Sequence, residues 1–328
     1  MRALVLGATG QLGANLVRAL LAKGDGVRAL VRPASKAITL RGVDVERVPG
    51  DLNDPDSLTR ACQGIDVVYH AAAYYPTSHI SGQAAKAQAL KETNNVLEAV
   101  RRCAVSRLIF TSTLTTIGFP AESGRLADET CAFSTAFPDN PYLAAKIAME
   151  DAVLDAARNG VPAVVLNPTA FFGPYDSKPT SGTQILMIAK RQMPGYLDGP
   201  TNVIDARDVA IAHIRAAERG RIGERYIVGN WNTTQKTLNE LIAKVAGTPA
   251  PKIPIPFFIA RFGSQFGDWA FRTILHKPAP IPGFFVEVFK HFQHYDCSKG
   301  LKELAYPQSP IEPAIRESFD WFRENGYV

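Results

Sequence analysis

The chain has 328 residues, 46% of them hydrophobic and 20% charged, a balance typical of a globular protein with one large domain or two moderate ones. Its formal charge is +5, but no run of five like charges and no basic stripe interleaved with aromatic residues occurs, so we expect no nucleic-acid partner. We expect no membrane-spanning segment and no secretory signal, which makes the cytoplasm the default location. The four scattered cysteines predict neither a disulfide framework nor a metal site.

The first half of the chain alternates short apolar strands with helical patterns. Strands are predicted at residues 2–8, 26–32, 45–51, 65–73, 105–114 and 161–168. Helices are predicted at residues 11–24, 55–64, 93–104 and 140–160. Alternation of this kind, with continuously apolar strands, is typical of a parallel sheet covered by helices on both faces.

The pattern changes after Pro168. Residues 169–202 are rich in loops, residues 203–228 return to strand, helix and strand, and the chain from about Asn230 is mostly helical and punctuated by prolines. We therefore predict an α/β fold, a Rossmann doubly wound parallel sheet with a smaller, mostly helical C-terminal substrate domain. Residues 1–168 plus 203–229 would form the dinucleotide-binding domain, and 169–202 plus 230–328 the substrate-binding domain.

The stretch GATGQLG follows the first strand and opens the first helix, as a dinucleotide-binding loop requires. Gly7 permits a tight turn, Gly10 lets the backbone approach a pyrophosphate, and Gly13 lets the helix pack closely on the strand. The helix N-terminus then presents free N–H groups to the phosphates. The loop by itself does not distinguish NAD(H) from NADP(H).

Residues after the second, third and fourth strands bear on the choice of cofactor. Arg32 stands where an NAD-binding chain would carry an acidic residue, so it favours the 2′-phosphate of NADP(H), although it could be a surface arginine and NAD(H) stays possible. Asp51 could meet the adenine amino group or cap the next helix. The small side chains of 71–73 would let the backbone lie along the cofactor, and His70 is interpreted as structural.

Tyr142 and Lys146 lie four residues apart, so they share one face of the long helix at 140–160. A phenol is a poor acid or base at neutral pH, and a nearby ammonium lowers its pKa. Thr111 and Thr113, at the end of the fifth strand, supply hydroxyls, of which that of Thr113 would hold the reacting oxygen.

In this order, the glycine loop, the acidic marker, the strand-end hydroxyls and the YxxxK pair resemble the extended short-chain dehydrogenase/reductase family, the NAD-dependent epimerase/dehydratase group. Within it the chain looks most like the dihydroflavonol 4-reductase-like branch, which includes proteins labelled hopanoid-associated sugar epimerases. The resemblance runs nearly end to end and includes LVLGATGQLGANLVRALL, RLIFTSTLTTIG, YLAAKIAME and VVLNPTAFFGP. It implies a catalytic triad of Thr113, Tyr142 and Lys146. The implied cofactor-binding residues are Gly7, Thr9, Gly10, Gln11, Leu12, Gly13, Arg32, Asp51, Leu52, Ala71, Ala72, Ala73, Thr111, Tyr142, Lys146, Asn167, Pro168 and Ala170.

Two departures from the family pattern matter. The family often carries Asn on the helix before the fifth strand, where this chain has Ala89, and Gln88 or Asn94 could compensate. Sugar 4,6-dehydratases of the family place an Asp-Glu pair directly after the catalytic Ser/Thr, where this chain has Leu114 and Thr115. Dehydration is therefore disfavoured.

The predicted function is NADP(H)-dependent reduction of a ketone or aldehyde of a fairly apolar small molecule, or oxidation of the alcohol, with Tyr142 as the acid or base. Two alternatives stay open, a nucleotide-sugar epimerase and a non-catalytic NADP-binding redox sensor. The long helix at 140–160 is apolar along one stripe, so it either pairs in a homodimer or is covered by its own chain. Ten C-terminal aromatic residues either form a core or line an apolar pocket: Phe257, Phe258, Phe262, Phe266, Trp269, Phe271, Phe284, Phe285, Phe289 and Phe292.

Overall fold

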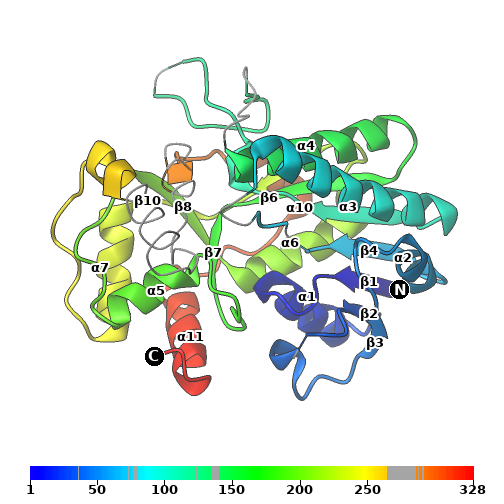
Figure 1. The fold of residues 1–328 in the computed structure, drawn as a ribbon, viewed down its shortest axis with the longest axis horizontal. Coiled ribbons are helices and arrows are strands. Elements are labelled where there is room, and N and C mark those ends of the chain that lie inside the picture. Colours follow the sequence, from blue (N-terminus) through cyan, green and yellow to red (C-terminus); the bar gives the residue numbers. More distant parts are fainter. Residues whose placement is uncertain are drawn as a thin grey trace.

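The computed structural model describes residues 1–35, 37–72, 74–76, 80–122, 124–133, 140–263, 286, 288, 289 and 292–328. A seven-stranded sheet in the order β3-β2-β1-β4-β5-β6-β9 forms the centre of the molecule (Figure 1). All of its strand pairs are parallel. The strands are β1 Arg2–Leu6, β2 Gly26–Val31, β3 Glu46–Pro49, β4 Val67–His70, β5 Arg107–Thr111, β6 Ala163–Pro168 and β9 Arg225–Val228.

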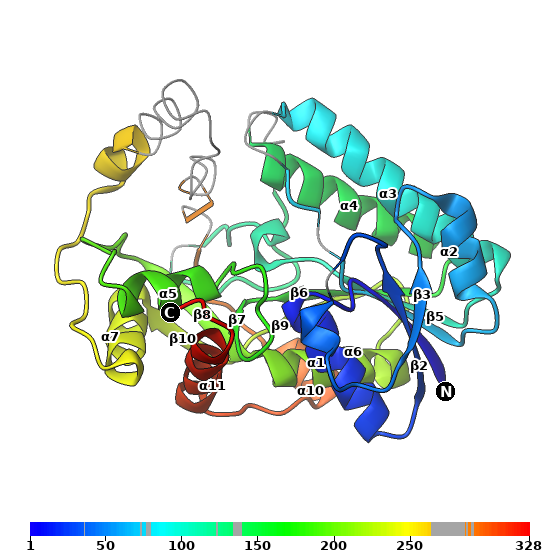
Figure 2. The same ribbon diagram turned by 60° about the horizontal axis from the view of Figure 1, so that its bottom comes forward.

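Helices cover both faces of this sheet, as Figure 2 shows. One face carries α1 (Gln11–Ala22), α6 (Ala206–Arg219) and α10 (Ser298–Leu304); the other carries α2 (Pro55–Cys62), α3 (Gly82–Arg102) and α4 (Pro141–Arg158). Each layer buries its own apolar cluster against the sheet. The strands contribute side chains to both clusters, which is why they are continuously apolar. The fold is the predicted doubly wound Rossmann sheet.

A second, three-stranded sheet lies beyond the carboxyl edge of the large one (Figure 1). It joins β7 (Ala170–Phe172), β8 (Pro200–Asp205) and β10 (Trp231–Thr234). Three helices pack with it around a separate core, α5 (Gly182–Ala189), α7 (Gln235–Ala246) and α11 (Ile311–Glu324). This part of the chain is mostly helical, as expected, but the region 169–202 contains β7 and α5 besides its loops.

All seven strands of the large sheet coincide with predicted strands, whereas two other elements differ from expectation. The helix predicted at 93–104 begins at Gly82, because Ser81 caps it and the Ala-, Gln- and Lys-rich stretch that follows forms helix without a strong apolar period. The strand that opens the 203–228 segment is β8, which pairs with β7 and β10 rather than within the large sheet. The division into two domains stays a prediction, with β8 on the small-sheet side of it.

The apolar stripe of α4 is used inside the chain. Ala145, Met149, Val153, Ala156 and Ala157 are buried in the cluster that α3 and α4 form with the sheet. The stripe therefore gives no support to a homodimer, which stays a prediction.

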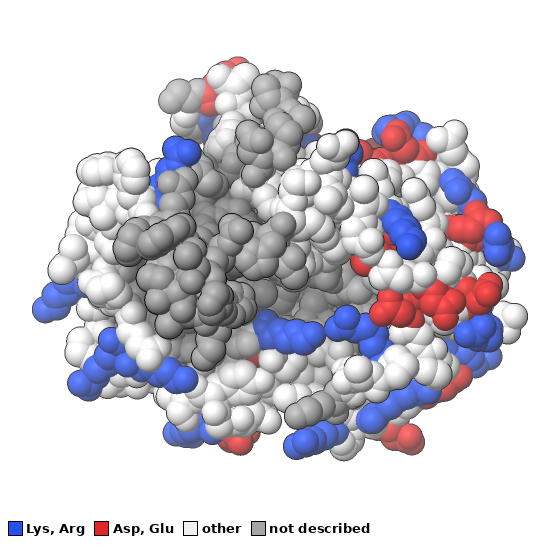
Figure 3. Space-filling model, in the orientation of Figure 1, with Lys and Arg blue, Asp and Glu red and all other residues white. Residues whose placement is uncertain are grey.

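The face drawn in Figure 3 carries both acidic and basic side chains among its described residues. Among the described helices, none is long and apolar enough to cross a bilayer.

Candidate active site

The glycine loop is packed so tightly that two of its glycines have no room for a side chain. Gly7 adopts φ +82°, and a Cβ there would lie 2.5 Å from the backbone nitrogen of Ala72. A Cβ on Gly13 would lie 2.2 Å from the carbonyl oxygen of Gly7. The loop thus lies against the chain that leaves β4, at the point between β1 and β4 where the strand order reverses and doubly wound folds bind their ligands.

The N-terminus of α1 is open for an anion. Gly10 is its N-cap and has no side chain that could accept a hydrogen bond. The first N–H groups of the helix therefore stay available to a ligand. The Gln11 side chain is turned away from this end, since its Nε2 donates to the carbonyl of Gly173 at 2.8 Å. The carbonyl of Thr9 accepts from the hydroxyl of Thr39 at 3.1 Å, which fixes the loop from outside. These features fit the pyrophosphate of a dinucleotide.

Arg32 is exposed just after β2 and close enough to Asp51 for its charge to act on that carboxyl. The pKa of Asp51 is lowered chiefly by the backbone N–H of Asn53, and the charge of Arg32 adds to this effect. The helix α2 is capped by Asp54, whose carboxylate accepts from the N–H groups of the next turn. Asp51 is therefore not the cap of α2, which was one of the two roles that the sequence allowed for it.

The start of α4 brings the Tyr and Lys side chains to the carboxyl edge of the sheet. Asn140 caps the helix by accepting from the N–H groups of Tyr142 and Leu143, both at 3.1 Å, and Pro141 begins the first turn. Tyr142 is 7% exposed and Lys146 4% exposed. The ammonium of Lys146 lies 5.8 Å from the centre of the Tyr142 ring. The pair therefore shares one face, as predicted.

Burial controls the ionisation of both groups. It raises the pKa of Tyr142, and hydrogen bonds with the Thr113 and Thr115 side chains counter part of the rise. Burial lowers the pKa of Lys146 to about 8. At neutral pH the phenol therefore holds its proton and most Lys146 side chains stay charged, an arrangement suited to giving a proton to a carbonyl oxygen.

Other predicted residues lie at the same edge, with different side-chain directions. Thr111 hydrogen-bonds His213 at 2.8 Å on the side of α6, so its hydroxyl is directed away from Tyr142. Asn167 directs its amide into a buried polar cluster beneath Thr113, at 3.2 Å from the Thr113 carbonyl. His70 is fully buried against Phe110, and burial together with the Lys146 charge lowers its pKa to about 4, in keeping with a structural role.

The remaining cofactor candidates fall along the same crevice. Leu52 packs against the apolar cluster of the α3 and α4 layer, as does Ala72. Pro168 is the last residue of β6, and Ala170 begins β7. Ala73 lies outside the described residues, as do Phe266, Trp269, Phe271, Phe284 and Phe285 among the C-terminal aromatic residues.

An apolar cavity of about 640 Å³ lies beside the small sheet, with Pro200 and Phe292 in its wall. Phe292 lines this cavity and also packs against the small cluster that contains Tyr142, Leu143 and Val288. The other lining residues are Leu197, Asp198, Gly199, Pro200, Gln235, Pro254, Ile255, Pro256, Phe257 and Phe289. Phe258 and Phe262, by contrast, are exposed. The five described aromatic residues of this set are thus divided between the cavity wall and the surface.

Sequence reasoning overlooked four residues of the site. Thr115 shares the hydrogen bonding of Tyr142, and Tyr75 stacks on the Tyr142 ring with centroids 5.8 Å apart. Glu150 and Arg225 form a buried ion pair with a 2.8 Å contact. A signal for Glu150 was present, since an acid one turn after Lys146 shares its helix face. Nothing in the sequence indicated Arg225, which comes from β9.

The comparisons with known proteins identify the family of the chain. The model of the NAD dependent epimerase/dehydratase family matches residues 3–229, which include the glycine loop, the Tyr-Lys pair and β9. The chain belongs to this family. A Synechocystis sp. protein with the provisional name dihydroflavonol 4-reductase is 35% identical over 99% of this chain and 95% of its own. Sterol demethylase protein B of Methylococcus capsulatus is 31% identical over the full length of both chains.

Among solved structures, a nucleoside-diphosphate-sugar epimerase from Pseudomonas aeruginosa superimposes with a TM-score of 0.85 and 29% identity, over 100% of this chain and 99% of that one. Vestitone reductase from alfalfa, at 22% identity and a TM-score of 0.72, shares the fold. Reductase names recur among the relatives, and one is cinnamoyl-CoA reductase 1 of Petunia hybrida. This member of the epimerase/dehydratase family is an NAD(P)-dependent oxidoreductase of the extended short-chain dehydrogenase/reductase type.

Proposed function

We propose that the enzyme reduces the carbonyl group of a fairly apolar ketone or aldehyde with NADP(H), or oxidises the corresponding alcohol. The observation that carries this proposal is the buried Tyr142–Lys146 pair, with Thr113 hydrogen-bonded to Tyr142 and with an apolar cavity whose Phe292 packs against the cluster around Tyr142. Bound NADPH would supply the hydride to the carbonyl carbon. Tyr142 gives its proton to the carbonyl oxygen, and Thr113 holds that oxygen with its hydroxyl.

The choice of NADP(H) rests on Arg32. Its guanidinium is exposed after β2 and forms no ion pair among the described residues, so it is available to a 2′-phosphate. The structures of related epimerases that carry NAD in their names share the fold at 20–23% identity. NAD(H) therefore stays the alternative cofactor, and the ratio of the two dissociation constants decides between them.

The proposal of an apolar substrate rests on the cavity that Phe292 lines. Apolar side chains form most of its wall, and Phe292 also packs against the cluster of Tyr142, Leu143 and Val288. Two further relatives have names that specify apolar carbonyl compounds, a farnesyl-dihydroquinoline-oxide ketoreductase of Stigmatella aurantiaca and a 2-alkyl-3-oxoalkanoate reductase of Stenotrophomonas maltophilia. Both relatives cover more than nine tenths of this chain.

The experiment that tests the proposal is NADPH oxidation with a panel of alkyl and polycyclic ketones, compared between the parental enzyme and Tyr142→Phe. We expect the variant to lose about 100-fold or more of the turnover, because a positioned acid contributes 10²–10⁴-fold. Tyr226→Phe, which removes a phenolic hydroxyl bonded to Glu303 in the layer of α1, α6 and α10, serves as the matched control. Unchanged turnover in Tyr142→Phe would show that this mechanism is wrong.

A nucleotide-sugar epimerase is the second candidate, favoured by the 29% identical epimerase structure. An enzyme of that kind keeps its cofactor through the cycle, so the protein as purified would contain tightly bound NAD and would show no net NADPH consumption. Release and analysis of the bound nucleotide distinguishes the two candidates. A protein that binds NADPH but turns over neither class of substrate would support the third candidate, a redox sensor.

A further inference from the structure

Below the Tyr-Lys pair lies a carboxylate that the proposed reaction does not use. Glu150 is 3% exposed, and its two oxygens receive four partners. One oxygen, Oε2, accepts from the Ser112 hydroxyl and lies 2.6 Å from both the Thr116 hydroxyl and the Asn167 side-chain nitrogen. The other, Oε1, accepts from Arg225 Nη1 at 2.8 Å. One side chain of α4 thus links the ends of β5 and β6 to β9.

The partners of Glu150 surround the backbone of Thr113. The Asn167 side-chain nitrogen lies 3.2 Å from the Thr113 carbonyl oxygen, and the Thr116 hydroxyl lies 2.8 Å from the same oxygen. The Thr113 side chain is in turn a hydrogen-bond partner of Tyr142. A change at Glu150 therefore reaches the tyrosine through three hydrogen bonds, from Glu150 to Thr116 or Asn167, from there to Thr113, and from Thr113 to Tyr142.

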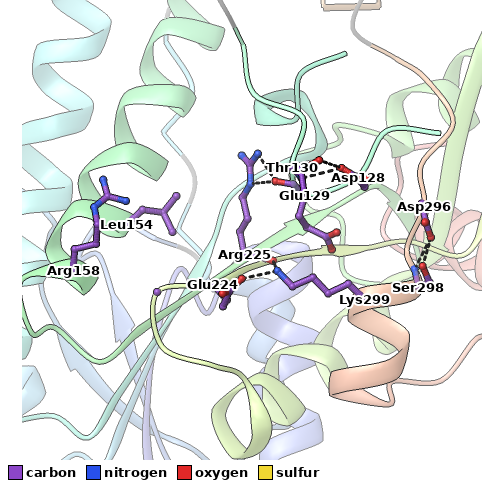
Figure 4. A pocket seen from close by; sticks show the side chains of 11 residues that line it. Asp128, Glu129, Thr130, Leu154, Arg158, Glu224, Arg225, Asp296, Ser298 and Lys299 are labelled. Atoms are coloured by element: carbon purple, nitrogen blue, oxygen red, sulfur yellow. Dashed lines mark hydrogen bonds and ion pairs between the residues drawn. The ribbon is translucent and has the colours of Figure 1, made fainter. Parts of the chain in front are cut away.

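Arg225 anchors this cluster from the other side. Its Nε and Nη2 donate to the carbonyl oxygen of Glu129 at 2.9 and 2.7 Å, and Nη2 also donates to that of Cys131 at 2.9 Å. Figure 4 shows the Arg225 side chain rising from β9 to this loop, at the edge of a cleft of about 400 Å³. With its guanidinium fixed by backbone carbonyls, Arg225 holds the Glu150 carboxylate in one place.

An ion pair between buried Glu150 and partly buried Arg225 adds little to stability by itself, because desolvation offsets much of the attraction between the charges. We propose that Glu150, held by Arg225, is a positioning residue that sets the Thr113 hydroxyl against Tyr142. The inference rests on the proposed function, in which Thr113 orients the reacting oxygen.

The test compares Glu150→Gln with Asp208→Asn, a matched control. Asp208 is also a buried carboxylate, bonded by the N–H and hydroxyl of Ser309, but it lies on α6 among residues outside the site. We expect Glu150→Gln to lower kcat at least tenfold with less than threefold change in KM for NADPH and for the ketone that the panel identifies. Asp208→Asn should change kcat less than twofold. Equal losses of kcat in the two variants would overturn the proposal.

A double variant separates positioning from folding. Glu150→Gln leaves the Arg225 charge buried and unpaired, whereas Glu150→Gln with Arg225→Met removes both charges. We expect the double variant to recover most of the thermal midpoint but not kcat, because its hydrogen bonds around Thr113 stay altered. Recovery of both quantities would assign the pair a structural role and overturn the proposal.

A measurement without substrate distinguishes failure of this inference from failure of the proposed function. Threonine methyl NMR of the whole protein reports the Thr113 signal, identified by its absence from Thr113→Ser. When NADPH is added, the shift or broadening of this signal in Glu150→Gln should differ from that in the parental protein. In Asp208→Asn it should be the same as in the parental protein. If the enzyme reduces no ketone of the panel, this spectrum alone tests the inference. A Thr113 signal that responds to NADPH in Glu150→Gln as it does in the parental protein overturns the inference.

Discussion

The carboxyl edge of the large sheet, which carries Tyr142, and the cavity beside the small sheet are built by different means. At the edge, the backbone packs so closely against Gly7 and Gly13 that no side chain fits there. Hydrogen bonds between strands and helices hold the polar groups, as around Glu150. In the cavity, apolar side chains from segments far apart in the chain, such as Pro200, Ile255 and Phe292, provide shape with few polar contacts. Under the proposed function, the chemistry would depend on fixed backbone geometry, and the choice of substrate on replaceable side chains.

If the carboxyl edge is the more rigid of the two regions, the largest loss of stability and binding follows from adding a side chain in the glycine loop. Gly13→Ala places a methyl group 2.2 Å from the Gly7 carbonyl, so α1 must move away from β1. Overpacking of a rigid site costs about 1–3 kcal/mol or more, and we expect a loss near the upper end together with loss of NADPH binding. Chemical denaturation and NADPH fluorescence measure the two effects.

Gly26→Ala is the control for Gly13→Ala. The nearest atom to its new methyl group is 3.7 Å away, and the residue lies in strand β2. We expect its stability to stay within about 0.5 kcal/mol of the parental value. A Gly13→Ala variant as stable as Gly26→Ala would mean that the edge is less rigid than the comparison requires.

A smaller effect is expected at the cofactor's outer end. Arg32→Ala should raise the Kd for NADPH about 10- to 100-fold and leave the Kd for NADH unchanged, because a charge-assisted contact to a phosphate contributes roughly 1.5–3 kcal/mol. Titration of both cofactors by intrinsic fluorescence measures this difference. Arg158→Ala removes an exposed arginine of α4 that pairs with Asp155, and it should alter neither constant. Equal weakening of NADH and NADPH would contradict the role of Arg32 in cofactor choice.

On the cavity side, Phe292→Ala should change specificity more than chemistry. The variant removes an aromatic ring from the wall, so KM for an apolar ketone should rise about 3- to 10-fold, with kcat within twofold. Phe292→Leu keeps much of the apolar area and should stay near the parental KM. A fall in kcat without a change in KM would show that Phe292 acts on the Tyr142 edge instead.

The same division explains what the sequence could predict. The strands, the glycine loop and the Tyr142–Lys146 spacing were predictable, because apolar periodicity and helix geometry are local properties of the chain. Arg225 was not, since its contact with Glu150 joins residues 75 positions apart. The start of α3 at Gly82 was missed because alanine, glutamine and lysine form helix without an apolar stripe.

The smallest expected effect is a change of stability with pH, caused by the burial of Lys146 at the carboxyl edge of the sheet. The Lys146 pKa of about 8 in the folded protein lies below the 10.5 of a free lysine, so above pH 8 the unfolded chain binds more protons than the folded one. Stability contributed by this group therefore rises with pH between these two values. From pH 7 to 8.5 the parental protein should gain about 0.8 kcal/mol relative to Lys146→Met. Urea denaturation of both proteins at the two pH values measures the difference, and a gain of zero or opposite sign would mean that Lys146 is solvated rather than buried beside Tyr142.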